Sequence, residues 1–337
     1  MYSSSFKEDL ITISNDILIP IDFHEKLVPA IIKYHELLCH SAVINAAGEN
    51  DREHVKTAHG NAIGPFWAAN CVKEVFRTQR FVQGLQQAIT DLHSKGREKV
   101  HVLYAGTGPF ATLALPIMLT FAPAQVQFTL LEINEDSMAR LKRLLEELGL
   151  MAYVRRIELA DAADYILKDT DIDILISETM NLALYREPQV SIMLNLGQQL
   201  KKETILIPQE IKVSFLGRWN SGDKIEPVKT LFQFNADYIR QKLQEVGPKR
   251  WKFEKSQLAL SLQADEQLCY LTDVQIYKDF RLGLNDCSLT LPKLLKPFGL
   301  AGEINLEFEY QVSDIPGFLA TATKIEQHSR SSNNDNS

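Results

Sequence analysis

Short apolar runs alternate with amphipathic stretches between residues 100 and 207, and this alternation is the clearest pattern along the chain. The run at 172–177 is apolar enough for a central strand of a parallel sheet. Strands that alternate with helices form βαβ units, so the pattern predicts an α/β fold with a doubly wound sheet. The predicted strands are 100–104, 126–132, 153–159, 172–177 and 204–207, and the predicted helices are 109–121, 134–149 and 188–200.

The helix after the second strand carries signals at both ends. Asn134 is a good N-cap, because its side chain can accept a hydrogen bond from a free N–H of the first turn. Glu135 and Asp136 lie in that turn, where the helix dipole favours anions. Gly149 suits the left-handed position that often follows a helix. We therefore expect a helix that begins just after Asn134 and ends just before Gly149.

The regions on either side of this sheet have different patterns. Residues 24–48 and 64–95 are predicted to be helical, and the segment between them, rich in Gly and Asn, is predicted to be a loop. From about residue 208 the pattern changes to short strands, with helical residues at about 226–246. The predicted strands of this part are 210–217, 268–279, 286–291 and 303–312.

These patterns predict four parts. We expect an N-terminal helical cap followed by an α/β domain, then a smaller β-rich domain with a helical insertion, and finally a polar, disordered tail. The expected ranges are 1–95 for the cap, 96–208 for the α/β domain, 209–326 for the β-rich domain with its insertion at about 221–265, and 327–337 for the tail.

Composition narrows the classes of partner. The 337 residues carry a net charge of −7, and an acidic protein gains nothing from counterion release at phosphates, so we expect no nucleic-acid partner. The four cysteines form no CxxC pair, so neither a metal site nor a disulfide framework is indicated. No apolar stretch approaches the ~20 residues that span a bilayer, and no signal-peptide pattern opens the chain. We therefore expect a cytoplasmic protein with no membrane partner.

A Gly-rich turn follows the first strand of the α/β domain. The backbone of Ala105, Gly106 and Gly108 lies where ligands bind in doubly wound folds, and the glycines would allow a close approach. Phe110 replaces the third glycine of a dinucleotide fingerprint, which disfavours pyrophosphate. A tight strand-to-helix turn with no ligand is the alternative interpretation.

Acidic residues at two other strand ends extend this candidate site. Glu132 closes the second strand, where a carboxylate can accept both hydroxyls of a ribose. Asp161 follows the third strand and could accept an adenine amino group, or it could be a surface carboxylate. Together with the glycine turn, this is the pattern of methyltransferases that use S-adenosylmethionine (SAM). Arg77, in the helical stretch before the sheet, could pair with the SAM carboxylate or be a surface arginine.

The segment after the fourth strand closely resembles the double-glutamate loop of protein arginine methyltransferases. It carries Ser177-Glu178-Thr-Met180 and a second glutamate, Glu187, nine positions after the first. The resemblance is specific over about 100–210 and looser outside it. It implies that Glu178 and Glu187 are catalytic and that both bind the substrate with Met180. It also implies a Rossmann-like SAM domain, a β-barrel and a homodimer formed by an arm at 221–265.

Two glutamates suit a guanidino substrate. A guanidinium is planar, with donors on both edges that two carboxylates can bind. SAM is also a cation at its sulfonium, and burying two positive charges together is costly unless anions compensate. The alternative interpretation is that both glutamates are solvated loop charges.

The sequence also departs from the family. The Thr-His-Trp loop near the end of the family's barrel is missing, so we expect a shortened barrel. This favours free arginine or a small guanidino metabolite as the substrate, with protein arginine close behind. Five N-terminal histidines could line a substrate lid or act as bases, but such histidines are more often partly exposed residues of helices and loops. The segment 59–65 could close over the cofactor. The alternatives are methylation of another N, O or C acceptor in a biosynthetic pathway, a non-catalytic SAM-binding scaffold and, less favoured, a nicotinamide dehydrogenase.

Overall fold

The structure, a computed structural model, describes most of the chain. The expected disordered tail at 327–337 lies outside the described residues. Within the described part, no helix is both long enough and apolar enough to cross a lipid bilayer. The described residues are 4–19, 24–45, 47–218, 227–246, 251–263 and 266–325.

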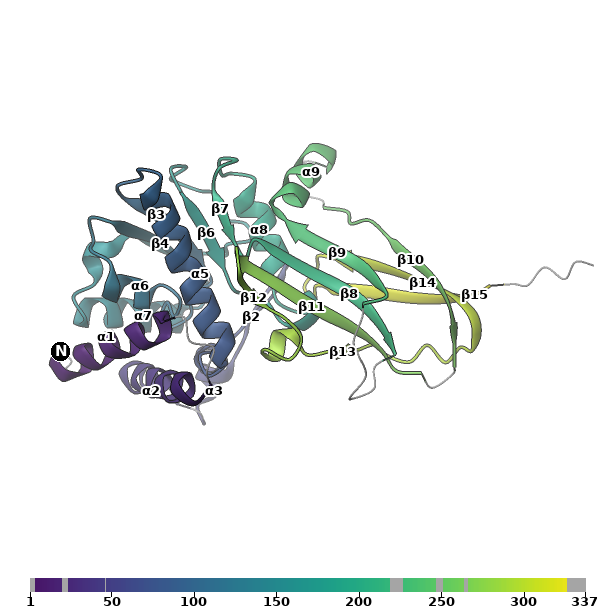
Figure 1. Ribbon diagram of the computed structural model, residues 1–337, viewed down its shortest axis with the longest axis horizontal. Helices are drawn as coiled ribbons and strands as arrows, with labels where there is room; N and C mark the ends of the chain where they lie inside the picture. Colours follow the sequence, from purple (N-terminus) through teal and green to yellow (C-terminus); the bar gives the residue numbers. More distant parts are fainter. Residues whose placement is uncertain are drawn as a thin grey trace, which may run out of the picture.

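A five-stranded parallel sheet forms the centre of the α/β half, which lies on the left in Figure 1. Its order is β5-β4-β3-β6-β7, so the chain starts in the middle, runs out to one edge and returns to fill the other. This confirms the predicted Rossmann-like α/β fold. The connections reverse direction between β3 and β6, and ligands bind at the carboxyl ends of strands at such a point. The strands are β3 (Val100–Ala105), β4 (Val126–Glu132), β5 (Val154–Leu159), β6 (Ile174–Ser177) and β7 (Ile205–Ile207).

Helices connect these strands largely as the sequence predicts. The side chain of Asn134 accepts a hydrogen bond from the Ser137 N–H, which confirms the predicted N-cap. Gly149 has φ +68°, as the predicted end of that helix requires. The connection between β3 and β4 differs from the prediction, because only the second half of the predicted helix at 109–121 is helical. The helices of this half are α5 (Val75–Ser94), α6 (Leu115–Thr120), α7 (Glu135–Glu147), the 3-10 turn η1 (Met151–Tyr153) and α8 (Gln189–Gly197).

The N-terminal region packs against the α/β half. The Tyr34 hydroxyl donates to the Thr112 carbonyl and the Arg143 guanidinium to that of Ser41. The expected loop between the two helical stretches contains a short helix and a two-stranded hairpin. The expected helix at 64–95 is divided into α4 and α5. The elements are α1 (Ser4–Leu18), α2 (His24–Ala42), α3 (Glu49–Arg52), β1 (Val55–Thr57), β2 (Gly60–Ala62) and α4 (Pro65–Cys71).

The C-terminal half consists of two antiparallel sheets, on the right in Figure 1. One has the order β12-β11-β8-β9 with β13 paired to β11, and the other has the order β10-β14-β15. Aromatic rings fill the core: Phe232 stacks on Tyr310 with centroids 5.2 Å apart, and Phe215 lies 5.3 Å from Phe308. The strands are β8 (Glu210–Arg218), β9 (Lys229–Asn235), β10 (Ser256–Leu262), β11 (Leu268–Tyr277), β12 (Phe280–Leu282), β13 (Lys293–Leu294), β14 (Gly302–Gln311) and β15 (Gly317–Lys324).

Several expectations for this half are wrong. Residues 229–235 are strand β9 and not helix, because they pair with β8; the helix is the shorter α9 (Ala236–Val246). The expected strand at 286–291 is instead the 3-10 turn η3 (Ser288–Thr290). Strands β10 and β15 were not expected.

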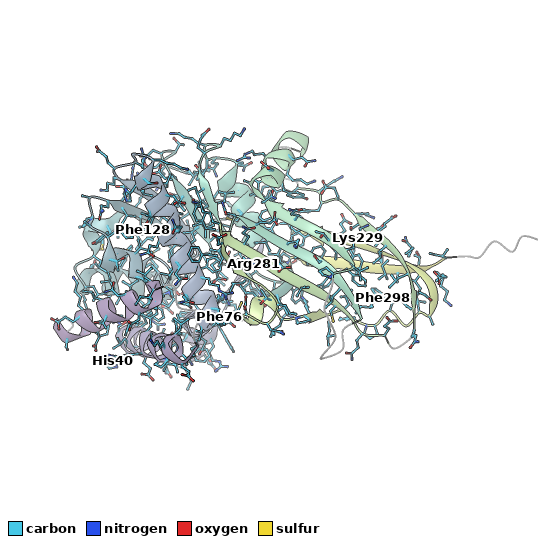
Figure 2. The ribbon with its side chains drawn as sticks, viewed as in Figure 1. His40, Phe76, Phe128, Lys229, Arg281 and Phe298 are labelled. Atoms are coloured by element: carbon cyan, nitrogen blue, oxygen red, sulfur yellow. The ribbon has the colours of Figure 1, made fainter. Side chains whose placement is uncertain are left out.

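Helix α5 joins the two halves. Arg80 donates to the Arg281 carbonyl and pairs with Asp286, and Figure 2 shows Phe76 and Arg281 at this junction. A Cβ on Gly84 would lie 2.7 Å from the Ile276 side chain, so only glycine permits this approach. Helix α5, which also carries Arg77, is therefore in direct contact with the β-rich half.

Candidate active site

A cavity opens at the carboxyl ends of β3, β4 and β6. It lies where the strand connections reverse, which is the ligand position of doubly wound folds. Ala105 is fully buried in β3 and does not line it, in contrast to its sequence neighbours. We call this space the cofactor-side cavity. Of the residues singled out from the sequence, it brings together Arg77, Gly106, Gly108, Glu132, Asp161, Glu178 and Glu187.

The Gly-rich turn forms the floor of this cavity. Gly106 has φ +77°, and a Cβ there would lie 2.2 Å from Cγ2 of Thr179. The close approach that requires glycine at 106 is therefore to the chain after β6. Gly108 has φ +61° and also lines the cavity. The turn thus brings the ends of β3 and β6 into direct contact.

Glu132 binds the same turn. Its Oε2 accepts from the Gly108 N–H at 2.6 Å, and its Oε1 accepts from the N–H groups of Ile133 and Asn134 at 3.0 and 2.9 Å. Burial raises the pKa of Glu132, and these backbone donors oppose that shift. A ribose at this strand end would share oxygens that already fix the turn. Glu132 therefore has a structural role that the sequence alone did not indicate.

Asp161 and the N-terminal hairpin border the cavity. Oδ1 of Asp161 accepts from the Ala163 N–H at 2.9 Å. The hairpin contributes Thr57 and Asn61 to the cavity wall. His59 reaches Asp164 at 3.1 Å, which links the hairpin to the segment after β5. The segment 59–65 therefore borders the cavity, where the sequence placed a closing loop.

Arg77 lies between two carboxylates. Its Nε and Nη2 both donate to Oε1 of Glu178, at 2.9 and 2.6 Å, and its Nη1 donates to Oε2 of Glu74 at 2.9 Å. Only 8% of the Arg77 side chain is exposed. Although burial acts to lower the pKa of Arg77, Glu178 and Glu74 raise it above the ordinary value. Among the described residues, Oε2 of Glu178 accepts no hydrogen bond.

A second cavity adjoins the first. It shares Ile63, Cys71, Arg77 and Glu187 with the cofactor-side cavity. Burial raises the pKa of the Cys71 thiol to about 11, so this thiol is protonated at neutral pH. We call this space the acceptor-side cavity. Its other lining residues include Met180, Glu74, His54, Trp67, Asn181 and Leu289.

The N-terminal histidines lie apart from one another. His54 lines the acceptor-side cavity, and its Nδ1 accepts from the Gly64 N–H at 3.2 Å. In neutral His54 the proton is therefore on Nε2, so this nitrogen is a hydrogen-bond donor. Nε2 of His35 lies 3.2 Å from the Cys39 sulfur. Among the described residues, no group of three or more His, Cys, Asp or Glu is arranged to hold a metal ion.

The loop that carries Glu178 and Glu187 has an unusual backbone. Ala183, Leu184 and Arg186 have φ values of +52°, +54° and +70°, a region that costs energy for residues other than glycine. Such strain persists only where surrounding contacts fix the conformation. Those contacts come from distant parts of the chain: Thr272 Oγ1 accepts from the Ala183 N–H, the Tyr310 hydroxyl donates to the Leu184 carbonyl, and the Pro316 carbonyl accepts from the Arg186 N–H.

Glu187 differs from Glu178 in its surroundings. Its carboxylate makes no hydrogen bond or ion pair with any described residue, although it lines both cavities. Burial raises the pKa of Glu187 to about 7; Arg77 opposes the shift and Glu178 adds to it. Burial also raises the pKa of Glu178, and Arg77 opposes that shift. The site therefore holds one carboxylate paired with an arginine and one that is free to pair with a ligand.

Sequence reasoning missed several residues of this site. Glu74 is the second partner of Arg77, and it also accepts from the Ser288 N–H at 3.3 Å. Its position three residues before Arg77 on a predicted helix was the available signal. Tyr310 and Thr272 lie more than 80 residues from the loop they support, and no local pattern marks them.

Comparisons with known proteins give little further detail. The sequence matches no protein-family model, and no curated protein matches it. Among solved structures, the fold is similar to a chain of the Trypanosoma brucei PRMT1 enzyme-prozyme heterotetrameric complex with AdoHcy. That similarity has a TM-score of 0.47 and 13% sequence identity, and it covers 75% of this chain and 96% of the other.

Proposed function

We propose that this protein is a SAM-dependent N-methyltransferase that acts on a guanidino group. The observation that carries the proposal is Glu187, a partly buried carboxylate that lines both cavities and has no partner among the described residues. A carboxylate withdrawn from water without a partner is costly unless a cationic ligand compensates it. A guanidinium is such a ligand, and the nearby Glu178 offers a second acceptor.

The residues of the cofactor-side cavity fit SAM. Glu132 and Asp161 can hold the ribose hydroxyls and the adenine amino group. Arg77 donates three hydrogen bonds to Glu178 and Glu74, which leaves two of its five N–H groups for the carboxylate of the methionine part. When bound, SAM supplies an electrophilic methyl group on a positively charged sulfur. The three residues lie at the ends of different elements, as an extended nucleoside ligand requires.

On the acceptor side, the two carboxylates would hold the guanidinium. Oε2 of Glu178 and the carboxylate of Glu187 are the free acceptors, and together they can fix the orientation of one guanidino nitrogen. Two anions also offset the repulsion between two cations. The nitrogen that gains a methyl group loses a proton, and Glu187 is suited to accept it because its pKa lies at about 7.

Free arginine or a small guanidino metabolite is the favoured acceptor, with protein arginine close behind. The acceptor-side cavity carries Glu74 and Glu187, which favour a cation, and polar groups of His54 and Asn181 that suit further hydrogen bonds. The decisive experiment is methyl transfer from labelled SAM to free arginine, arginine peptides and a panel of amines, offered side by side. No transfer to any guanidino compound, with SAM binding intact, would contradict the proposed substrate class.

Glu178→Gln and Glu187→Gln test the roles of the two carboxylates. We expect each to lower kcat by at least about 100-fold, because positioning and proton transfer both depend on them. SAM affinity in Glu187→Gln should change by less than about threefold, since that carboxylate is not a cofactor ligand. Normal turnover in both variants would refute the carboxylate assignment.

The pH dependence of the wild-type enzyme gives an independent test. Because the raised pKa of Glu187 is about 7, its anionic form, which the guanidinium requires, increases as the pH rises through 7. We therefore expect kcat/KM to increase about tenfold per pH unit below 7 and to level off above it. Glu187→Asp should retain an acidic limb, whereas Glu187→Gln should lose it. A flat profile between pH 5.5 and 8 would be inconsistent with a role for this group.

A further inference from the structure

The hairpin of β1 and β2 makes direct backbone contact with the peptide that precedes Glu187. The Asn61 N–H donates to the Arg186 carbonyl at 2.8 Å. A Cβ on Gly60 would lie 2.7 Å from that same oxygen and 3.2 Å from the carbonyl carbon of Glu187. Gly60 also has φ +133°, which other residues rarely adopt. The hairpin therefore contacts the glutamate loop at Arg186, one of its three residues with a positive φ.

The hairpin is itself well ordered. Thr57 pairs with Gly60 and Lys56 with Asn61 in the two-stranded register. The Thr57 hydroxyl donates to the Gly60 carbonyl and accepts from the His59 N–H, both at 3.0 Å. These bonds give the turn a fixed shape, so it can act as a rigid support for its neighbour.

The same hairpin also borders the cofactor-side cavity. Thr57, Asn61 and Ala62 line that cavity, while the Asn61 N–H points to the acceptor loop. One short strand thus contacts both the space for the donor and the backbone that carries Glu187. The peptide unit that the Asn61 N–H holds is the one that sets the direction in which Glu187 leaves the loop.

We propose that Gly60 and Asn61 are positioning residues for Glu187 and couple a ligand in the cofactor-side cavity to the acceptor carboxylate. The proposal rests on the proposed methyltransferase function. The contacts from Thr272, Tyr310 and Pro316 hold the loop from the β-rich half. The hairpin holds it from the opposite side and completes the support at the residue next to Glu187.

Two pairs of variants separate this role from general stability. Asn61→Pro removes the N–H that reaches Arg186, and Asn61→Ala retains it while also losing the side chain. Gly60→Ala places a methyl group against the Arg186 carbonyl. Gly96→Ala is its control, because Gly96 also has a positive φ, +88°, but a Cβ there meets nothing within 4 Å.

We expect kcat at saturating SAM to be at least tenfold lower in Asn61→Pro than in Asn61→Ala. It should be at least tenfold lower in Gly60→Ala than in Gly96→Ala, which should match the wild type. Affinity for S-adenosylhomocysteine should change by less than threefold in Gly60→Ala. Equal kcat values within each pair would overturn the proposal, as would a loss of kcat fully explained by lost binding.

Hydrogen exchange gives a readout that does not depend on turnover. S-adenosylhomocysteine should slow exchange in both 57–63 and 183–188 of the wild type. In Gly60→Ala it should slow exchange in 57–63 alone. Unchanged protection of 183–188 in that variant would overturn the coupling while leaving the proposed function intact. A wild-type protein that fails to bind S-adenosylhomocysteine would instead overturn the proposed function, and this proposal with it.

Discussion

The cofactor side and the acceptor side of this site are built in different ways. On the cofactor side, Gly106, Glu132 and Asp161 lie at or just after the carboxyl ends of three parallel strands and need only the sheet to bring them together. On the acceptor side, Glu187 lies on a strained loop whose only regular structure is the short 3-10 turn η2 (Leu182–Leu184). That loop is held by contacts from β11, β14, the segment before β15 and the N-terminal hairpin.

This difference shows which part of the site each half of the molecule supports. The α/β half alone contains the strand ends, whereas the acceptor loop requires the β-rich half and the hairpin as well. Changes in the β-rich half should therefore affect the acceptor side first. Arg77 belongs to both sides, because it lines both cavities and binds Glu178.

Arg77→Met should lower the stability of the protein more than any other substitution considered for this site. It removes a buried cation and leaves Glu178 and Glu74 uncompensated, which costs about 3–5 kcal/mol in comparable buried pairs. We expect the free energy of unfolding, measured in denaturant, to fall by that amount. The double variant Arg77→Met/Glu178→Gln should recover part of the loss, because one buried charge is then removed.

Arg156→Met is the matched control for Arg77→Met. Arg156 also pairs with two carboxylates, Asp169 and Glu158, but at the surface, with 38% of its side chain exposed. Exposed ion pairs contribute little, so this variant should be close to the wild type in stability. If Arg77→Met were no less stable than Arg156→Met, the buried pair would not be a link between the two sides.

Much of the cofactor side could be predicted from the sequence, because its signals are local. The strands at 100–104 and 126–132 are continuous apolar runs, and Asn134 and Gly149 mark the ends of the following helix. Parallel order then places the strand ends together. The role of Glu132 in holding the Gly108 N–H was missed, since a hydrogen bond from a backbone N–H to a side chain on a neighbouring strand leaves no mark on the sequence.

The acceptor side and the β-rich half were less predictable, because their structure depends on pairing between distant residues. Residues 229–235 alternate in burial and pair with β8, yet they run directly into α9 and were expected to be helical with it. Glu178 and Glu187 were found through a resemblance in one loop. The conformation of that loop depends on Thr272 and Tyr310, whose contribution is visible only in the folded chain.

Gly106→Ala should damage the cofactor side by an intermediate amount. The new Cβ would overlap Cγ2 of Thr179, and the backbone at φ +77° would be strained. We therefore expect the free energy of unfolding to fall by about 2–4 kcal/mol. Thr179→Ser removes Cγ2 and keeps the hydroxyl. The double variant Gly106→Ala/Thr179→Ser should therefore recover the part of the stability loss that comes from the overlap. Gly149 has φ +68°, and a Cβ there would meet nothing within 4 Å, so Gly149→Ala measures the stability loss from backbone strain alone. No recovery in the double variant would mean that the contact with Thr179 is not what requires glycine.

Tyr310→Phe should have the smallest effect on stability and the most selective effect on function. It removes the hydroxyl that donates to the buried Leu184 carbonyl, which should lower the free energy of unfolding by about 1 kcal/mol. Tyr153→Phe is the control, because its hydroxyl also donates to a carbonyl, that of Phe121, far from the site. Both variants should be destabilised to a similar extent and bind SAM normally. Only Tyr310→Phe should lower kcat, by about fivefold, since it alone loosens the acceptor loop. Equal kcat values would mean that the β-rich half stabilises the protein without positioning Glu187. The two sides of the site would then differ in how they are supported structurally but not in how that support affects catalysis.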